Sequence, residues 1–251
     1  MADGNQTDAS RVSELSQVLP GKFIAVDGID GSGKTSLIAG LQRALREYDL
    51  EVEIARDPGG TRTGDAIRQL VLQCQDDAIC PRCETLLFMA ARAQLVAEVI
   101  ASARERGACV LCDRFVSSTL AYQVAAGVRA SDVGELGEFA IAGCWPDLTI
   151  ILDVGVEEAF KRTGRKVAPG PVPNHLKNDH TQLPLIEGAR LDMISQRSAS
   201  YFRRVRSLFL KLHLNYPTPV RVVDARSSME ATLHDALATI RDIFCAQVKD
   251  T

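Results

Sequence analysis

The chain has 251 residues, of which 46 % are hydrophobic and 24 % are charged, and these are the proportions of a globular protein that buries a full core. No apolar run approaches the roughly 18–20 residues that cross a bilayer. Residues 1–20 are polar and have neither the basic start nor the apolar centre of a secretory signal. We therefore expect a disordered leader over 1–20, a single domain over 21–251 and a cytoplasmic location.

Five short apolar, β-branched runs alternate with helical patterns along the chain. The predicted strands are 22–27, 51–55, 108–112, 148–153 and 219–223. The predicted helices lie at approximately 35–48, 64–73, 84–106, 131–143, 156–164, 188–212 and 229–246. This alternation predicts an α/β fold with a five-stranded parallel sheet and helices on both faces.

The first predicted strand leads into the pattern Gly-x-x-x-x-Gly-Lys-Thr, which starts at Gly28 and ends at Thr35. A loop of this kind cradles phosphates, because its glycines let backbone N–H groups point inward. Lys34 is expected to reach the outer phosphates, and the Thr35 hydroxyl to bind Mg²⁺. The pattern predicts a P-loop NTPase-type fold. The residues expected to bind a nucleoside triphosphate are Gly28, Ile29, Asp30, Gly31, Ser32, Gly33, Lys34, Thr35 and Ser36.

Charged residues follow the second and third predicted strands, at the edge where open parallel sheets bind ligands. Arg56 is better placed there for a phosphate than for a salt bridge. Asp113 ends an apolar strand as the acid that completes a Mg²⁺ shell, and Arg114 beside it suits a second phosphate group. Asp30, inside the P-loop, would repel phosphate. We expect it to contact a sugar hydroxyl, or Mg²⁺ through water.

The helix predicted from residue 84 places Glu84, Phe88 and Arg92 on one face, because they are four residues apart. Two readings are open for this face. Phe88 can belong to the core, or Phe88 and Arg92 can form an aromatic surface with a donor for a flat base.

The segment from Lys161 to Arg206 holds ten Lys and Arg residues against three acidic ones. A solvated helix face explains such a segment, but in a P-loop protein it is also a natural phosphate clamp. Within it, residues 167–184 contain four prolines and predict a flexible loop. We expect a lid over about 161–200, with 167–184 as its flexible insert.

Two Cys-x-x-Cys pairs, Cys80/Cys83 and Cys109/Cys112, have zinc-like spacing. Cys109 and Cys112 fall in a predicted strand, where residues three apart point to opposite faces, so they cannot chelate one ion together. Cys74, Cys80 and Cys83 supply three thiolates without an evident fourth ligand. Reduced thiols are the default expectation.

Two sets of phosphate-binding residues, the P-loop with its basic lid and the Arg56/Arg114 pair, indicate two phosphorylated substrates that face each other. That is the arrangement of a phosphoryl transferase. The Asn-Lys-x-Asp tetrad of a GTPase does not occur in the chain. A recombinase-like or motor ATPase remains open, and so does a regulatory ATP-binding module, which should lack the second arginine set.

The chain resembles the thymidylate kinase family over nearly its whole length, from Lys22 to the last predicted helix. The resemblance rests on five motifs in order, at 26–35, 56–61, 84–94, 113–123 and 146–154. It implies transfer of the ATP γ-phosphate to dTMP, giving dTDP for dTTP biosynthesis, with Mg²⁺ held by Thr35 and Asp113. It also implies a homodimer, with neither nucleic acid nor a membrane as partner. Another nucleoside or nucleoside monophosphate kinase of the same fold is the alternative.

The resemblance also implies roles for single residues. Phe88 would stack on thymine, Arg92 would bind its edge, and Tyr122 would crowd the sugar 2′ position. Asp30 would meet the sugar 3′-hydroxyl. The residues implied to bind dTMP are Asp30, Arg56, Phe88, Arg92, Arg114, Ser118, Thr119, Tyr122 and Gln123. The residues implied in catalysis are Lys34, Asp30, Arg114, Arg162, Arg165 and Arg190.

The family divides by whether the P-loop or the lid supplies a catalytic basic residue. The relevant P-loop position here is Gly31, so we expect the lid to supply it, from Arg162, Arg165 or Arg190. The chain departs from the family in the 167–184 insert, in Val124 where glycine is frequent and in Asp57 where glutamate is commoner. Asp57 precedes Pro58 where the family often has a cis peptide bond.

Overall fold

A computed structural model describes residues 15–47, 49–73, 79–165 and 198–245. Its centre is a five-stranded parallel sheet with the strand order β2-β3-β1-β4-β5. The strands are β1 (Phe23–Asp27), β2 (Val52–Arg56), β3 (Cys109–Asp113), β4 (Leu148–Asp153) and β5 (Val220–Asp224). Each lies within one residue of its predicted position, and the predicted fold class is confirmed.

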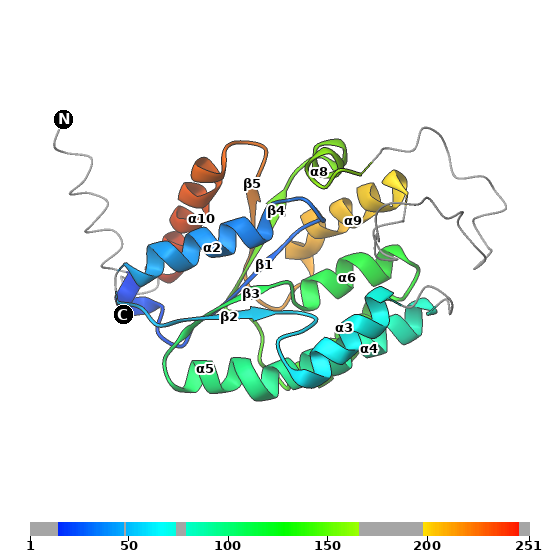
Figure 1. Ribbon diagram of the computed structural model, residues 1–251, viewed down its shortest axis with the longest axis horizontal. Helices are drawn as coiled ribbons and strands as arrows, with labels where there is room; N and C mark the ends of the chain where they lie inside the picture. Colours follow the sequence, from blue (N-terminus) through cyan, green and yellow to red (C-terminus); the bar gives the residue numbers. More distant parts are fainter. Residues whose placement is uncertain (1–14, 48, 74–78, 166–197, 246–251) are drawn as a thin grey trace.

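Helices cover both faces of the sheet (Figure 1). On one face lie α2 (Lys34–Arg46) and α10 (Met229–Phe244). The remaining helices are α3 (Arg62–Gln73), α4 (Pro81–Leu95), α5 (Ala101–Glu105), α6 (Val116–Ala125), α7 (Ala130–Ile141), α8 (Val156–Arg162) and α9 (Ala199–Lys211). A π-helical turn, Val96–Ile100, joins α4 to α5, and a 3₁₀ turn, Leu212–Leu214, follows α9.

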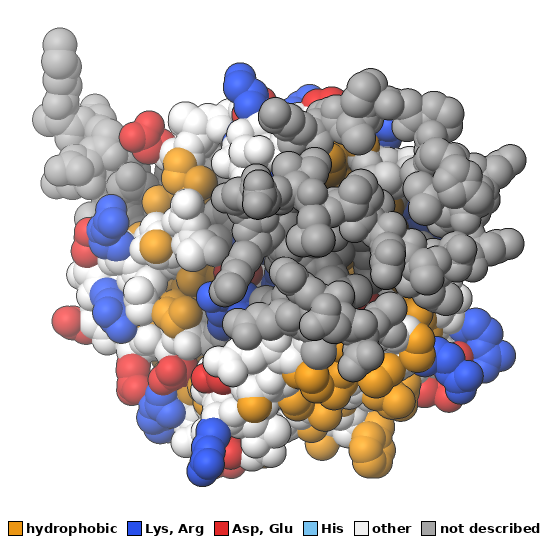
Figure 2. Space-filling model, turned by 45° about the vertical axis from the view of Figure 1, so that its right-hand side comes forward, with side chains coloured by type: hydrophobic (Ala, Val, Ile, Leu, Met, Phe, Trp, Pro, Cys, Tyr) orange, Lys and Arg blue, Asp and Glu red, His pale blue; other side chains and the backbone are white. Residues whose placement is uncertain are grey.

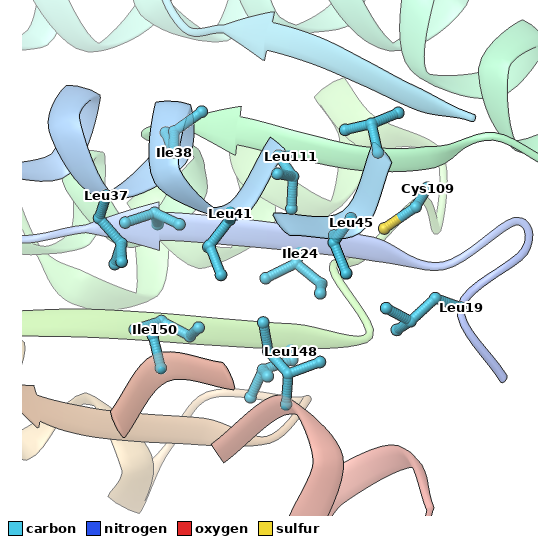
Figure 3. Close-up of a cluster of buried hydrophobic side chains, with 14 of the residues drawn as sticks. Leu19, Ile24, Leu37, Ile38, Leu41, Leu45, Cys109, Leu111, Leu148 and Ile150 are labelled. Atoms are coloured by element: carbon cyan, nitrogen blue, oxygen red, sulfur yellow. The ribbon is translucent and has the colours of Figure 1, made fainter. Parts of the chain in front are cut away.

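The core is divided by the sheet, because successive strand residues point to opposite faces. In β1, Ile24 and Val26 pack toward α2 and α10 (Figure 3), while Phe23 and Ala25 pack on the other side. Cys109 and Cys112 likewise belong to different clusters, which confirms that they cannot share one ion.

The end of the expected leader is ordered, so the prediction of disorder is wrong for residues 15–19. They form a helical turn closed by a hydrogen bond from Leu19 N to Leu15 O at 3.0 Å. Leu15 and Leu19 are 2 % and 0 % exposed and join the cluster under α2 and α10. Burying two leucines offsets the entropy cost of ordering this short segment. Residues 1–14 lie outside the described residues.

The continuous helical run Pro81–Glu105 is long and apolar enough, by length and composition, to cross a membrane. Arg92 and Glu98 interrupt it, so the chain has no uninterrupted apolar run of that length in this helix. Here the run packs against α3, α6 and α7, and Leu95 and Ile100 are fully buried. One side of the run therefore belongs to the core of the fold, although less than half of its most apolar stretch, 44 %, is buried.

Helix α6 is absent from the predicted elements. Its sequence, VSSTLAYQVA, has no amphipathic stripe, because seven of its ten residues are buried. Periodicity cannot reveal a helix that is covered all round. The predicted helix 188–212 begins outside the described residues, and its described part is α9.

We expect Leu19→Ala to lower the free energy of unfolding by about 2–5 kcal/mol, because it removes a fully buried side chain from the core. The matched control is Gln17→Ala, at an exposed position of the same turn. Urea denaturation measures both variants. Equal stability of Leu19→Ala and wild type would show that this segment does not pack on the domain.

Candidate active site

The loop between β1 and α2 has the backbone geometry that its glycines permit. Gly28, Gly31 and Gly33 have φ angles of 140°, 83° and 96°, which residues with a Cβ rarely adopt. Crowding adds a second constraint. A Cβ on Gly28 would lie 2.6 Å from the Leu152 carbonyl oxygen, and one on Gly31 would lie 2.4 Å from that of Ala159. The P-loop therefore rests on β4 and on α8.

Lys34 begins α2 and folds back over the loop. Its ammonium donates hydrogen bonds to the carbonyl oxygens of Gly28 and Ile29, both at 3.1 Å. Burial, together with the nearby Arg114 guanidinium, lowers its pKa to about 8, while Asp30, Asp113 and Asp27 act in the opposite direction. The ammonium is therefore still protonated at neutral pH, and an incoming phosphate would favour that form further.

Asp27, the last residue of β1, holds three parts of the site together. Its fully buried carboxylate accepts hydrogen bonds from Gly28 N at 2.9 Å, Ser117 Oγ at 2.7 Å and Ser118 Oγ at 2.8 Å. The Arg114 guanidinium lies 3.6 Å away. The P-loop and the N-terminal turn of α6 are thus joined through one side chain.

Asp30 lies between two arginines. Arg114 donates to its Oδ1, and Arg165 donates to its Oδ2 at 3.1 Å. Burial disfavours the charged carboxylate, but the charges of Arg114, Lys34 and Arg165 outweigh it and lower the pKa of Asp30 to about 2. The start of the expected lid therefore already reaches the P-loop.

Arg114 is held in an uncommon backbone conformation. Its φ of 73° is in the left-handed region, which costs a residue with a Cβ about 1–2 kcal/mol. Its side chain donates to Ser118 Oγ at 3.0 Å, and the guanidinium lies 5.4 Å from the centre of the Tyr122 ring. Such local strain recurs at functional sites, where the surroundings over-determine it.

Thr35 and Asp113 meet where a metal would be expected. The Thr35 hydroxyl donates to Asp113 Oδ2 at 3.0 Å. Asp113 Oδ1 is buried and has no hydrogen-bond partner within the described residues. A hydroxyl and a carboxylate with an unused oxygen are ligands that Mg²⁺ prefers, so these residues fit the ion. Arg56 lies opposite Asp113 in the register of β2 and β3 and is exposed.

Arg92 is 2 % exposed, and its guanidinium already bonds to other groups of the protein. Its Nε forms an ion pair with Asp57 Oδ2 at 2.5 Å. Its Nη2 donates to Thr119 Oγ1 at 2.9 Å and to the Phe115 carbonyl at 3.1 Å. The first role of Arg92 in this structure is to join α4, α6 and the loop after β2.

Phe88 is buried one turn before Arg92, as their spacing predicts. Nearby, Gln123 Nε2 donates to the buried Glu84 Oε2 at 3.0 Å. A carboxylate only accepts hydrogen bonds, so this contact fixes which end of the Gln123 amide faces Glu84. Phe88, Arg92, Thr119 and Gln123 are thus brought together by α4 and α6.

The expected lid arginines are placed differently. Arg165 reaches Asp30, whereas Arg162 points along α8 to Glu158, with an Nε–Oε1 distance of 3.1 Å. Arg190 and the insert 167–184 lie outside the described residues. So does Cys74, while Cys80 and Cys83 are exposed. Within the described ranges, no three His, Cys, Asp or Glu residues are grouped to hold a metal ion.

Sequence reasoning missed three supporting residues: Asp27, Ser117 and the Asp57 carboxylate. Each acts by positioning another group, and no motif spacing marks such a residue. One signal was available, because polar residues that end or follow buried strands are rarely left without a partner. The cis Asp57–Pro58 bond that the resemblance implied is present.

We expect the stability difference between wild type and Asp30→Asn to depend on pH. Because the folded-state pKa is about 2 and the ordinary value is 3.8, ionised Asp30 stabilises the fold above pH 4, and the benefit fades as pH falls toward 2. The shift corresponds to about 2 kcal/mol.

Urea denaturation at several pH values measures the difference. Asp132→Asn, which removes an exposed ion pair with Arg129, is the control. An Asp30→Asn difference that stays constant down to pH 3 would contradict this assignment.

Comparison with known proteins identifies the family. The thymidylate kinase family model matches residues 26–170. The thymidylate kinase of Limosilactobacillus reuteri (strain DSM 20016) is 34 % identical over 229 residues, which cover 90 % of this chain and 98 % of the relative. That of Pelotomaculum thermopropionicum is 36 % identical over 232 residues, with 92 % and 98 % covered.

A solved structure agrees at the level of the fold. The crystal structure of thymidylate kinase from Ehrlichia chaffeensis superposes with a TM-score of 0.65 at 24 % identity, covering 88 % of this chain and 99 % of that one. The sequence relatives are matched over nearly their full length, so they support the family assignment more strongly than the shared fold alone does. The chain belongs to the thymidylate kinase family.

Proposed function

We propose that this protein transfers the γ-phosphoryl group of ATP to dTMP, giving dTDP. One observation carries the proposal: Asp30 pairs with both Arg114 and Arg165. Arg114 follows β3 beside the P-loop, and Arg165 lies at the start of the expected lid. Cations from two sides thus meet in front of Lys34. Two phosphorylated substrates that face each other need such an arrangement, whereas simple ATP hydrolysis does not.

The donor site comprises residues 28–36. The backbone N–H groups of the loop and the Lys34 ammonium bind the phosphates of ATP. Thr35 and Asp113 would hold Mg²⁺, which neutralises charge on the β- and γ-phosphates when it is bound. Asp113 Oδ1 has no partner among the described residues, and this supports the assignment.

The acceptor site lies between the ends of β2 and β3 and helices α4 and α6. Arg114 and the exposed Arg56 hold the dTMP phosphate, and Asp30 receives the sugar 3′-hydroxyl. Phe88 faces the base, with Arg92, Ser118, Thr119, Tyr122 and Gln123 around it. Because Arg92 is already bound to Asp57 and Thr119, it acts on the base as a fixed donor, with little freedom to lose on binding.

Positioning and charge neutralisation then supply the catalysis. An oxygen of the acceptor phosphate attacks the γ-phosphorus in line, and no covalent intermediate on the protein is needed. Negative charge on the transferred group is balanced by Lys34 from the P-loop and by an arginine of the lid. A lid arginine is required because no side chain fits at position 31, where a Cβ would collide with the Ala159 carbonyl.

The protein is proposed to act as a homodimer. Leu70 of α3, Leu86 of α4 and Phe139 of α7 are exposed, and Phe139 keeps 87 % of its surface accessible. These helices pack side by side, and hydrophobic side chains gather on the lower part of the molecule in Figure 2. A contiguous apolar face of this kind supports contact with a second copy.

An acceptor panel tests the function. Purified protein with ATP and Mg²⁺ is offered dTMP, dUMP, UMP, CMP, AMP or GMP, and ADP release is measured. We expect the highest kcat/KM with dTMP. Preference for AMP or GMP would overturn the thymidylate assignment in favour of another kinase of this fold. Absence of acceptor-dependent turnover would favour a regulatory ATP-binding module.

Alanine substitution tests the lid arginine. We expect Arg165→Ala to lower kcat by about 10²-fold or more, because it removes a charge that faces the transferred group. Arg162→Ala is the matched control, since its side chain pairs with Glu158 on the surface and should change kcat little. Arg190→Ala completes the series. If Arg165→Ala and Arg190→Ala both keep wild-type turnover, the lid does not supply the charge.

A further inference from the structure

We propose that Cys80 and Cys83 are a redox-active dithiol that closes reversibly into a disulfide on the first turn of α4. Both thiols are exposed, one at the N-cap and the other three residues on. The Cys-x-x-Cys spacing places a resolving thiol next to the thiol that reacts first. Arg82, exposed between them, adds a positive charge that attracts an anionic thiol oxidant.

The other described cysteines differ from this pair. Cys109 and Cys112 are fully buried in β3, and burial raises the pKa of Cys109 to about 12 and that of Cys112 well above its usual value. Buried, protonated thiols react slowly. Cys144 and Cys245 are half-buried and lie far apart in sequence. Within the described ranges, Cys80 and Cys83 are thus the accessible vicinal pair.

The geometry allows closure but does not favour it strongly. Helical residues three apart have Cβ atoms about 5–6 Å apart, whereas a disulfide needs about 3.5–4.5 Å. Cys80 has a ψ of 151°, outside the regular helix, and no side-chain capping hydrogen bond is seen within the described residues, so its side chain can move toward Cys83. Exposed, slightly strained disulfides are the labile, regulatory ones.

The chemistry needs an external disulfide as oxidant, such as oxidised glutathione. One protein thiolate attacks it, forms a mixed disulfide and releases one glutathione thiolate. The second protein thiolate then attacks the mixed disulfide and releases the other. One S–S bond forms in the protein and one breaks in the oxidant. The protein loses two electrons and two protons, and glutathione gains them.

A link between this site and the acceptor site follows from α4, and this step rests on the proposed function. The disulfide ring would adjoin the hydrogen bond from Glu84 N to Cys80 O at 3.0 Å, because Glu84 directly follows Cys83 and the Cys80 carbonyl belongs to the ring. Glu84 in turn orients the Gln123 amide beside the proposed base site. Tightening this turn shifts Glu84, so oxidation should change the KM for dTMP and leave the KM for ATP unaltered.

Peptide mapping tests the bond itself. Trypsin cleaves after Arg82, so a Cys80–Cys83 disulfide joins peptides 69–82 and 83–92 in a reducible cross-link. Cys74 shares the first peptide, and the experiment therefore uses full-length Cys74→Ser protein with a chelator present. After equilibration with glutathione buffers, we expect the cross-linked pair, lighter by two hydrogen atoms than the reduced peptides. In the added Cys83→Ser variant, a glutathione adduct on Cys80 should replace it.

Two results would overturn the proposal: a cross-link that forms only when Cys74 is present, or glutathione adducts on both thiols without a cross-link. Steady-state kinetics then compare oxidised and reduced Cys74→Ser protein, and we expect the KM for dTMP to change at least about fivefold. A cross-link with unchanged KM would overturn the link to the acceptor site. Mapping needs no turnover, so failure of the proposed function would leave the test of the dithiol intact.

Discussion

A single buried carboxylate sets the arrangement of this site. A fully desolvated aspartate is costly unless hydrogen bonds surround it. Asp27 meets that requirement with the first N–H of the P-loop and two serine hydroxyls of α6, and Arg114 lies close by. The P-loop and helix α6, the proposed donor and acceptor elements, are consequently fixed relative to each other before any substrate arrives. Preorganisation of this kind is what an in-line transfer between two bound nucleotides requires.

A second buried ion pair supports the proposed acceptor side. Arg92 and Asp57 join α4 to the loop after β2, where Arg56 emerges. Removing either partner would leave a charge buried and unpaired, which is strongly destabilising. The proposed base-facing and phosphate-facing parts of the acceptor site thus share this ion pair. Substitution of Arg92 is therefore expected to change folding and binding together.

Much of this was readable from the sequence, and the reasons are physical. The inner strands β1, β3 and β4 were predictable because buried parallel strands are continuous apolar runs, and the edge strands β2 and β5 because they are rich in β-branched residues. Lys34, Thr35 and Asp113 could be singled out because phosphate and metal chemistry restricts residue type and spacing. Helix α6 was not predictable, since burial all round removes its periodicity. Nor were the partners of Asp27 or Arg92, because a contact between residues distant in sequence leaves no local pattern. The leucines before β1 were hidden by their polar neighbours.

The contact between Gly31 and α8 has an evolutionary consequence. Backbone meets backbone there, since a Cβ on Gly31 would lie 2.4 Å from the Ala159 carbonyl oxygen. If the lid supplies the catalytic cation, as proposed, a lineage that moved this cation into the P-loop would need a new side chain at position 31 and, at the same time, a displaced α8. Neither change is useful alone, and the first is damaging. An enzyme with a lid cation and an otherwise similar enzyme with a P-loop cation therefore differ by at least two changes that must occur together.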